Sequence, residues 1–150
     1  MIIVLQKVKE ASVSVQGKIE GKIEFGVCLL VGIEKKDTEE DARYLARKIA
    51  ELRIFPDSQG KMNRSLSDVS GEVLAVSQFT LAGSVKKGRR PSFDRAEEPS
   101  RAESLFLYFV EQVRSFGLTV QTGVFAALME VSLINDGPVT FILQKNDSLS

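Results

Sequence analysis

The first 24 residues are rich in apolar and β-branched positions, and between Ala11 and Val15 apolar and polar side chains alternate. This pattern predicts strands, the alternating one half-buried. We expect strands over Ile2–Val8, Ala11–Val15 and Lys18–Glu24, with a Gln16-Gly17 turn before the third, as an antiparallel meander. The next segment, Val27–Ile33, is apolar on both faces, which favours a central strand covered on both sides.

Two segments have apolar positions at helical spacing. The first follows Asp37, which we expect to cap a helix with Glu40 three residues on, and it ends before Pro56. The second is expected to begin at a capping box of Ser100 and Glu103 and to stop at Gly117. The apolar faces comprise Ala42, Leu45, Ala46, Ile49 and Ala50 in the first segment, and Ala102, Leu105, Phe106, Phe109, Val110 and Val113 in the second.

The remaining segments complete a sheet. Pro56–Ser70 is polar and rich in turn residues, which predicts a hairpin or loop. Further strands are expected over Glu72–Leu81, Leu118–Gln121, Leu128–Ile134 and Val139–Gln144, with an irregular stretch over Ala82–Pro99 and a frayed tail over 146–150. Residues 1–150 are therefore predicted to form a single α/β domain, with a largely antiparallel or barrel-like sheet flanked by two amphipathic helices.

An apolar run near the C-terminus is broken in the middle. Asn135-Asp136-Gly137-Pro138 separates the apolar segments Met129–Ile134 and Val139–Leu143. Proline lacks a backbone donor and is excluded from central ladders, and glycine allows close backbone approach. An X-Pro bond also takes the cis form at the lowest cost. The segment is either an ordinary hairpin turn or a rigid presentation of backbone carbonyls that shapes a pocket.

Composition narrows the class of protein. Of the 150 residues, 43% are hydrophobic and 27% charged, with 20 basic and 20 acidic side chains, the balance of a soluble globular protein. Net charge therefore identifies no partner. No apolar stretch approaches the roughly 20 residues of a membrane span, and no basic-then-apolar signal peptide opens the chain. We expect a cytoplasmic protein with no membrane association.

The sequence contains no histidine and a single cysteine. Cys28 lies in an apolar run, so we expect a buried, inert thiol. Without histidine there are no Ser-His or Cys-His nucleophile pairs, and the acidic residues show no metal-binding spacing. We expect no metal and no cofactor. Any chemistry must depend on backbone groups, carboxylates, hydroxyls or the substrate itself.

A polar segment follows the core strand that begins at Glu72. Ser77-Gln78-Phe79-Thr80-Leu81 places two hydroxyls and an amide at the strand end. Thr80 has no adjacent base in the sequence and is a poor nucleophile. Backbone N–H groups of this turn can instead point at a developing oxyanion, an effect of about a hundredfold to a thousandfold per donor. The alternative is a strand end whose hydroxyls satisfy local hydrogen bonds.

Four positive charges fall within five residues, ahead of Pro91 and Phe93. They are Lys86, Lys87, Arg89 and Arg90. In a chain of zero net charge, this segment is a candidate for local phosphate binding. The alternative is a solvated basic loop.

Four separated segments resemble those of one known family, and they include two separated motifs in the family's order and spacing. They are SQFTL at Ser77–Leu81, RPSF at Arg90–Phe93, Thr122–Met129, and GPVT at Gly137–Thr140 with Asn135 before it. From Met1 to about Gln144 the chain resembles the D-aminoacyl-tRNA deacylases. The resemblance implies a homodimeric ester hydrolase that releases D-amino acids, or mischarged glycine, from the terminal adenosine of tRNA in chiral proofreading.

The resemblance also implies roles for single residues. Gly137 and Pro138 would form a cis unit that enters the neighbouring subunit's pocket, holds the substrate amino group with its carbonyls and excludes an L side chain. The N–H groups of Phe79 and Thr80 would form the oxyanion site. An aminoacyl ester is already activated, and the terminal ribose offers its 2′-hydroxyl to assist water. A protein without histidine can therefore be the enzyme.

Further residues are implied around this centre. Ser77 and Gln78 would shape the pocket; Phe125 and Met129 would pack on the terminal adenine, with Ala126 in the same segment. Core packing is the alternative for these three. The basic segment Lys86–Arg90 would meet the tRNA backbone. The family usually has arginine where this chain has Lys7. Lysine lacks the planar fork that holds two acceptors, which leaves open whether Lys7 braces the Gly-Pro segment.

Two other functions remain as alternatives. A non-enzymatic tRNA-binding module would use the basic loop and Phe93, and would retain tRNA without turnover. A small-molecule esterase would cleave D-amino-acid esters that lack a nucleotide. Such substrates bring no assisting hydroxyl, which disfavours this alternative.

Overall fold

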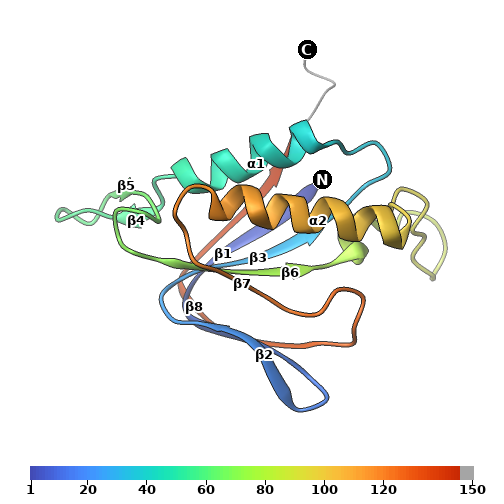
Figure 1. Ribbon diagram of the computed structural model, residues 1–150, viewed down its shortest axis with the longest axis horizontal. Coiled ribbons are helices and arrows are strands. Elements are labelled where there is room, and N and C mark those ends of the chain that lie inside the picture. Colours follow the sequence, from blue (N-terminus) through green and yellow to red (C-terminus); the bar gives the residue numbers. More distant parts are fainter. Residues whose placement is uncertain (146–150) are drawn as a thin grey trace.

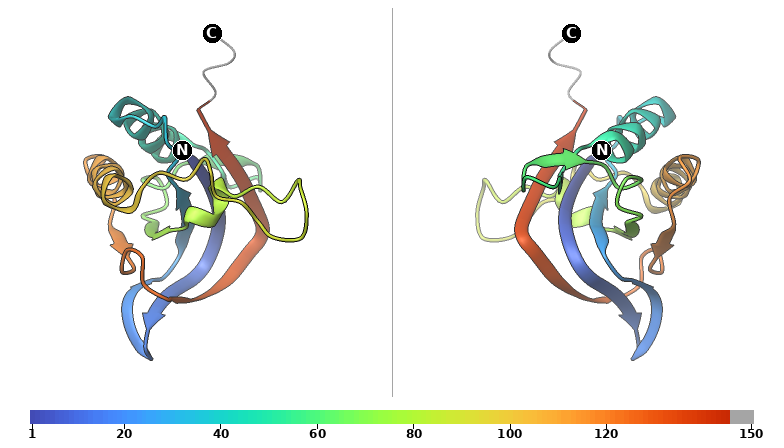
Figure 2. Two further views of the ribbon diagram at one scale, coloured as in Figure 1. Left: turned by 90° about the vertical axis from the view of Figure 1, so that its right-hand side faces the viewer. Right: turned by 90° about the vertical axis from the view of Figure 1, so that its left-hand side faces the viewer.

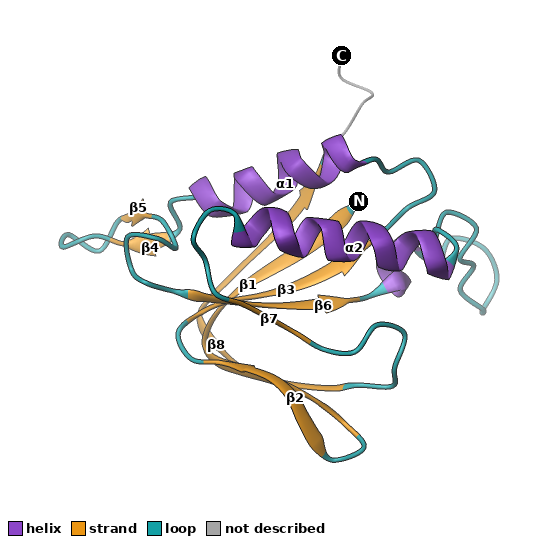
Figure 3. Cartoon of the chain, viewed as in Figure 1, coloured by secondary structure: helices purple, strands orange, loops and turns teal. Residues whose placement is uncertain are grey.

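The computed structural model describes residues 1–145. The tail expected to fray, 146–150, lies outside the described residues. Two helices lie against one face of a curved sheet (Figures 1 and 3). The helices are α1 (Glu39–Glu51) and α2 (Pro99–Arg114), and the strands of the main sheet are β1 (Ile2–Val15), β2 (Lys18–Ile23), β3 (Gly26–Gly32), β6 (Glu72–Ser77), β7 (Val120–Thr122) and β8 (Glu130–Gln144).

Strand β1 is paired along both of its edges. On one edge it pairs antiparallel with β3 and then with β2, and on the other it pairs antiparallel with β8 from Ile2–Gln144 to Ser14–Glu130. The sequence predicts two strands here, and this prediction is wrong: the exposed Lys9 and Glu10 stay extended. The reason is that β8 provides a ladder along the whole length of β1.

The sheet is mixed and curls toward a barrel (Figure 2). Strands β3 and β6 pair in parallel, and so do β6 and β7, whereas the pairs of β1 are antiparallel. The predicted α/β domain with a barrel-like sheet and two amphipathic helices is therefore confirmed. A separate short hairpin, β4 (Phe55–Pro56) and β5 (Met62–Arg64), forms where Pro56–Ser70 predicts a hairpin or loop.

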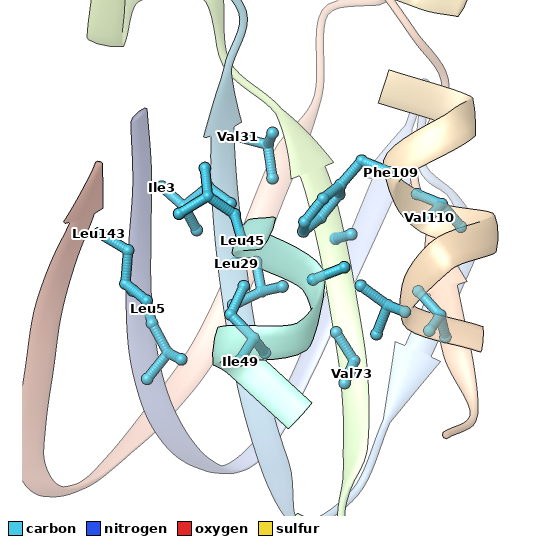
Figure 4. Packing of buried hydrophobic residues seen from close by; sticks show 14 of the residues in the cluster. Ile3, Leu5, Leu29, Val31, Leu45, Ile49, Val73, Phe109, Val110 and Leu143 are labelled. Carbon is cyan, nitrogen blue, oxygen red and sulfur yellow. The ribbon is translucent and has the colours of Figure 1, made fainter. Parts of the chain in front are cut away.

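The main core lies between the helices and the sheet (Figure 4). Phe109 and Val110 of α2 and Leu45 and Ile49 of α1 point toward the apolar side chains of the sheet, and all four are buried. A second cluster on the opposite face contains Val8, Ala11, Val13, Ile23, Cys28, Leu74 and Val76. Strand β3 is therefore covered on both faces, as its apolar sequence predicts.

Both helices begin at residues other than those predicted. Thr38, not Asp37, caps α1: its Oγ1 accepts from the N–H of Asp41 at 3.3 Å, and Asp41 Oδ2 accepts from the N–H of Thr38 at 2.9 Å. Asp37 instead accepts hydrogen bonds from the Met1 ammonium and from the N–H of Glu34. A capping box thus forms one residue later because another partner holds Asp37.

Helix α2 is capped by Glu98 rather than by Ser100. The Glu98 carboxylate accepts from the N–H of Arg101 at 2.6 Å, and Pro99 occupies the first helical position, which needs no N–H donor. This backbone hydrogen bond lowers the pKa of Glu98. The C-terminal stop at Gly117 is confirmed, because that residue has a φ of +81°.

Burial distinguishes two neighbours on α2 that are both large and apolar. Phe109 is fully buried, whereas Leu107 is half exposed. We expect Phe109→Ala to lower the free energy of unfolding by about 3 to 5 kcal/mol, because it removes a ring and leaves a cavity. Leu107→Ala should change it by less than about 1 kcal/mol. Urea denaturation measures both; equal effects of the two changes would contradict this packing.

Candidate active site

A pocket of about 620 Å³ opens at the carboxyl ends of the parallel strands β3 and β6. Two segments that are distant in sequence line opposite parts of it. All seven residues predicted from them line this one pocket: Ser77, Gln78, Phe79, Thr80, Phe125, Ala126 and Met129. The structure thus brings together the strand-end motif and the adenine-side segment.

The first wall comes from the end of β6. The strand stops at Ser77, and Phe79–Ala82 form a 3₁₀ turn, η1, where the sequence predicts that the strand continues to Leu81. The N–H of Gln78 still donates to the carbonyl of Val31 on β3 at 2.8 Å. That hydrogen bond places the turn against the end of the neighbouring strand.

Two backbone donors are left without acceptors at this turn. The N–H groups of Phe79 and Thr80 open η1, where no preceding turn supplies a carbonyl, and neither makes a hydrogen bond within residues 1–145. The Thr80 hydroxyl accepts from the side-chain amide of Gln78 at 2.9 Å. The local bonding expected for the hydroxyls is therefore present at Thr80, while the two N–H groups remain open to a ligand.

The second wall is the segment between β7 and β8. Phe125 is half-buried and packs against Phe106 of α2, with ring centroids 6.1 Å apart. Met129 is also half-buried and packs on the second core cluster. A Cβ at Gly123 would lie 2.6 Å from its sulfur, so a larger residue at 123 would displace the Met129 side chain. Phe125 and Met129 each contribute to a core and to the pocket.

A third wall was not predicted from the sequence. Ala96, Glu97, Pro99 and Ala102 line the pocket from the irregular segment and the start of α2. The N–H of Glu97 donates to the carbonyl of Ile33 at 3.1 Å, which ties this segment to the end of β3. The one feature of the sequence that could have pointed to this wall is Pro99, because proline is common at the start of a helix.

Glu97 is the one ionisable side chain among the residues that line the pocket in the described part of the chain. It accepts from the N–H of Glu98 at 2.9 Å and is ion-paired with Arg101. The hydrogen bond from Glu98, followed by the Arg101 interaction, lowers the pKa of Glu97 despite some desolvation. An ionised carboxylate already bound to two partners is a poor general base, so Thr80 has no evident activating group.

Gly137 and Pro138 do not line this pocket. The hairpin-turn interpretation is wrong, because β8 pairs with β1 on both sides of the segment. Gln6 pairs with Thr140 and Val8 with Asn135, so Asp136 to Val139 form a bulge opposite the single residue Lys7. Proline cannot donate a hydrogen bond to a neighbouring strand, and the bulge places Pro138 outside the ladder between β8 and β1. The Gly137–Pro138 peptide bond is cis, and both residues are exposed.

Lys7 lies directly under this bulge. The residue is only 8% exposed, and its Nζ is 3.5 Å from Asp136 Oδ2 and 5.8 Å from the ring centroid of Phe55. Lys7 pairs with Val27 on β3, and the pocket residue Val31 lies four residues further along. At 3.3 Å per residue, that is about 13 Å. Within one chain, the bulge therefore lies level with the start of β3, whereas the pocket lies at the end of β3.

The basic residues Lys86, Lys87, Arg89 and Arg90 also lie outside the pocket. All four are exposed, and none makes an ion pair within residues 1–145. Their loop projects from the end of the molecule that carries η1 and the start of α2 (Figures 1 and 2). It closes through a pair of backbone hydrogen bonds between Ser84 and Ser92, of 2.8 and 2.9 Å. The loop adjoins the pocket but does not enter it.

Cys28 is buried in the second core cluster, as the sequence predicts. Burial raises the pKa of its thiol to about 11. A thiol that stays protonated near neutral pH is a poor nucleophile. Cys28 is also absent from the pocket lining, so it is not a candidate for the chemistry of this site. Within residues 1–145, neither helix is long and apolar enough to cross a bilayer.

Known proteins share this sequence over nearly its full length. The family described as D-Tyr-tRNA(Tyr) deacylase matches residues 4–144. Proteins named D-aminoacyl-tRNA deacylase from Bacillus cytotoxicus (strain DSM 22905) and Bacillus thuringiensis (strain Al Hakam) are 58% and 60% identical over 144 residues. In each case the match covers 96% of this chain and 99% of the relative.

Solved structures share the fold as well. One titled "c-Myc DNA Unwinding Element Binding Protein" is 41% identical, with a TM-score of 0.90 over 97% of this chain and 99% of that chain. Another, titled "Structural Analysis of a probable eukaryotic D-amino acid tRNA deacylase", is 19% identical, with a TM-score of 0.82 over 95% of this chain and 97% of that chain. The second shows likeness of fold alone.

These findings define a hydrolase, since a deacylase removes an acyl group by hydrolysis. More particularly, the chain belongs to the D-Tyr-tRNA(Tyr) deacylase family. The resemblance found in the sequence is thereby confirmed.

Proposed function

We propose that this protein hydrolyses the ester bond of D-aminoacyl-tRNA, and of mischarged glycyl-tRNA, releasing the free amino acid and tRNA. The observation that carries the proposal is the meeting of two distant family segments, Ser77–Thr80 and Phe125–Met129, in one pocket. Membership of the deacylase family supports it. The pocket is also large enough for a nucleoside ester, since ligand sites commonly span about 300 to 1,000 Å³.

The reaction depends on backbone donors in this proposal. Water adds to the ester carbonyl carbon, and the carbonyl oxygen becomes an oxyanion that accepts from the N–H groups of Phe79 and Thr80. The bond between the carbonyl carbon and the ribose oxygen then breaks, and that oxygen takes the proton lost by the water. The neighbouring 2′-hydroxyl of the ribose assists the proton transfer. The two unpaired N–H groups at η1 support this assignment.

The remaining pocket residues hold the terminal adenosine. Phe125 and Met129 offer apolar surface for the adenine, with Ala126 beside them, and Ser77 and Gln78 shape the floor at the end of β6. Outside the pocket, the four cations of the Lys86–Arg90 loop meet phosphates of the tRNA. Phosphate contacts of this kind position a nucleic acid without reading its sequence.

Chiral selection comes from a second subunit. The chain's own Gly137–Pro138 bulge lies level with the start of β3, whereas its own pocket lies at the end of that strand and is not lined by Gly137 or Pro138. We propose a homodimer in which the bulge of each subunit enters the other's pocket, binds the substrate amino group through carbonyls and leaves no room for an L side chain. Strand β8 supports this arrangement, because it exposes Ile134, Phe141 and Ile142 and pairs only through β1 within residues 1–145.

The activity is tested by comparing the two stereoisomers of one substrate. D-tyrosyl-tRNA and L-tyrosyl-tRNA are incubated with the protein, and released tyrosine is measured over time. We expect release from the D form alone, because the exclusion is steric. Equal release from both forms would contradict chiral selection. Retention of tRNA without release from either form would instead favour the non-enzymatic tRNA-binding module.

A small-molecule esterase is tested in the same series. A D-tyrosine methyl ester has no ribose hydroxyl to assist water, so we expect no acceleration of its hydrolysis. Comparable turnover of the methyl ester and of D-tyrosyl-tRNA would contradict the assistance proposed for the ribose.

A further prediction concerns Lys7, which lies under the bulge. Lys7→Met keeps the buried stem but removes the charge next to Asp136. We expect D-tyrosyl-tRNA deacylation to fall by up to about 100-fold, the effect of displacing a positioning group by about 1 Å. Removing one partner of an ion pair leaves the other unpaired and costs stability, so the Tm should fall. The Asp136 side chain is 29% exposed and keeps contact with water, so we expect the protein to remain folded at the assay temperature.

Two variants control for the Lys7 result. Lys9→Met removes a charge from the exposed part of β1 and should leave the rate unchanged, whereas Lys7→Arg should keep most of the activity. A Lys7→Met protein with the wild-type rate and the wild-type preference for the D form would show that Lys7 does not brace the bulge.

A further inference from the structure

An exposed aromatic pair stands at the mouth of the pocket. The ring centroids of Phe79 and Phe93 are 5.1 Å apart, with planes inclined by 59°. The exposed fractions of the two residues are 61% and 38%, although large aromatic residues are usually far more buried. Phe79 lines the pocket and Phe93 does not. The pair therefore runs from the pocket edge outward over the surface.

Phe93 is held in place by its surroundings. A Cβ on Gly83 would lie 2.8 Å from its ring, so the ring rests directly on the backbone at the end of η1. The N–H of Ala96 donates to the Phe93 carbonyl at 3.0 Å. The residue before it, Ser92, forms the two hydrogen bonds with Ser84 that close the basic loop. The aromatic pair thus lies between the pocket and four unpaired cations.

Aromatic faces beside a basic surface suit one ligand chemistry in particular. Single-stranded nucleic acids bind where bases stack on aromatic side chains and cations hold the phosphates. A substrate whose terminal adenosine lies in the pocket must place its preceding nucleotide near the pocket mouth, and the 3′ end of tRNA is unpaired there.

We propose that Phe93, supported by Phe79, is a stacking platform for the unpaired base that precedes the terminal adenosine. The adjoining loop of Lys86, Lys87, Arg89 and Arg90 holds the phosphates of this strand. The inference rests on the proposed function for its substrate, and it adds a contact outside the pocket. With this platform, the protein recognises more of the substrate than the terminal nucleoside. Stacking of this kind does not require a particular base.

The test uses two substrates that differ only in length. One is D-tyrosyl-adenosine, and the other is a D-tyrosyl oligonucleotide ending in CCA. We expect Phe93→Leu to lower kcat/KM for the oligonucleotide by roughly tenfold, the effect of losing one stacked base, and to leave D-tyrosyl-adenosine unchanged. Phe93→Trp enlarges the stacking face and should retain the wild-type kcat/KM on both.

A matched control comes from the other end of α2. Phe116 is exposed to 39% and lies outside the pocket, so Phe116→Leu should change neither rate. Two outcomes would overturn the platform. In one, Phe93→Leu slows both substrates equally, which means that the ring contacts the adenosine or the amino acid. In the other, it slows neither.

A binding measurement separates this inference from the proposed function. The affinities of an uncharged oligonucleotide ending in CCA and of adenosine monophosphate are measured for the wild-type protein and for Phe93→Leu. A selective loss of oligonucleotide affinity supports the platform even if the wild-type protein releases no amino acid, in which case the proposed hydrolysis fails alone. Unchanged oligonucleotide affinity overturns the platform.

Discussion

The pairing of β1 along both edges is the constraint on which the rest of the structure depends. One edge holds β3, which leads through β6 to the pocket, and the other holds β8, which carries the Gly137–Pro138 bulge. Because both ladders are fixed to one strand, the distance between pocket and bulge is fixed too. A chain built in this way holds its own bulge away from its own pocket, and this separation is the reason for proposing that a second copy of the chain supplies the bulge.

The pocket explains how a protein without histidine can belong to a hydrolase family. The donors at its centre are main-chain N–H groups, whose position depends on where β6 ends and η1 begins. The ionisable lining residue, Glu97, is already bound by Glu98 and Arg101. In the proposed reaction, the substrate is an activated ester that brings its own hydroxyl, so the protein would have to position groups and exclude others. The bulge on β8 suits the second task because its carbonyls and its bulk are parts of the backbone.

Local patterns in the sequence predicted most of the elements, and long-range pairing accounts for most of the errors. The two helices follow from apolar spacing, and β3 follows from an apolar run. The continuity of β1 through Lys9 and Glu10 could not be predicted, because it depends on β8 more than 100 residues away. Pro138 suggested a turn because the continuation of β8 past it also depends on pairing with the distant strand β1. The caps shifted because Asp37 is bound to Met1 and because Glu98 competes with Ser100.

The candidate site was predicted where the chemistry lies in short motifs, and missed where it lies in packing. Ser77–Thr80 and Phe125–Met129 were found, whereas Ala96 and Glu97 belong to no motif, and a hydrogen bond from the Glu97 N–H to Ile33 holds their segment at the pocket.

The central claim is that the bulge of one subunit completes the pocket of the other. Mixed dimers test it most directly. One subunit carries Gly137→Val, which is strained at a φ of +134°. The other carries Ala127→Trp at a residue that lines the pocket, so that the larger side chain fills it. If the bulge acts across the dimer, each parent is inactive and the mixed dimer regains one working pocket of its two; a mixed dimer as inactive as its parents would contradict the account.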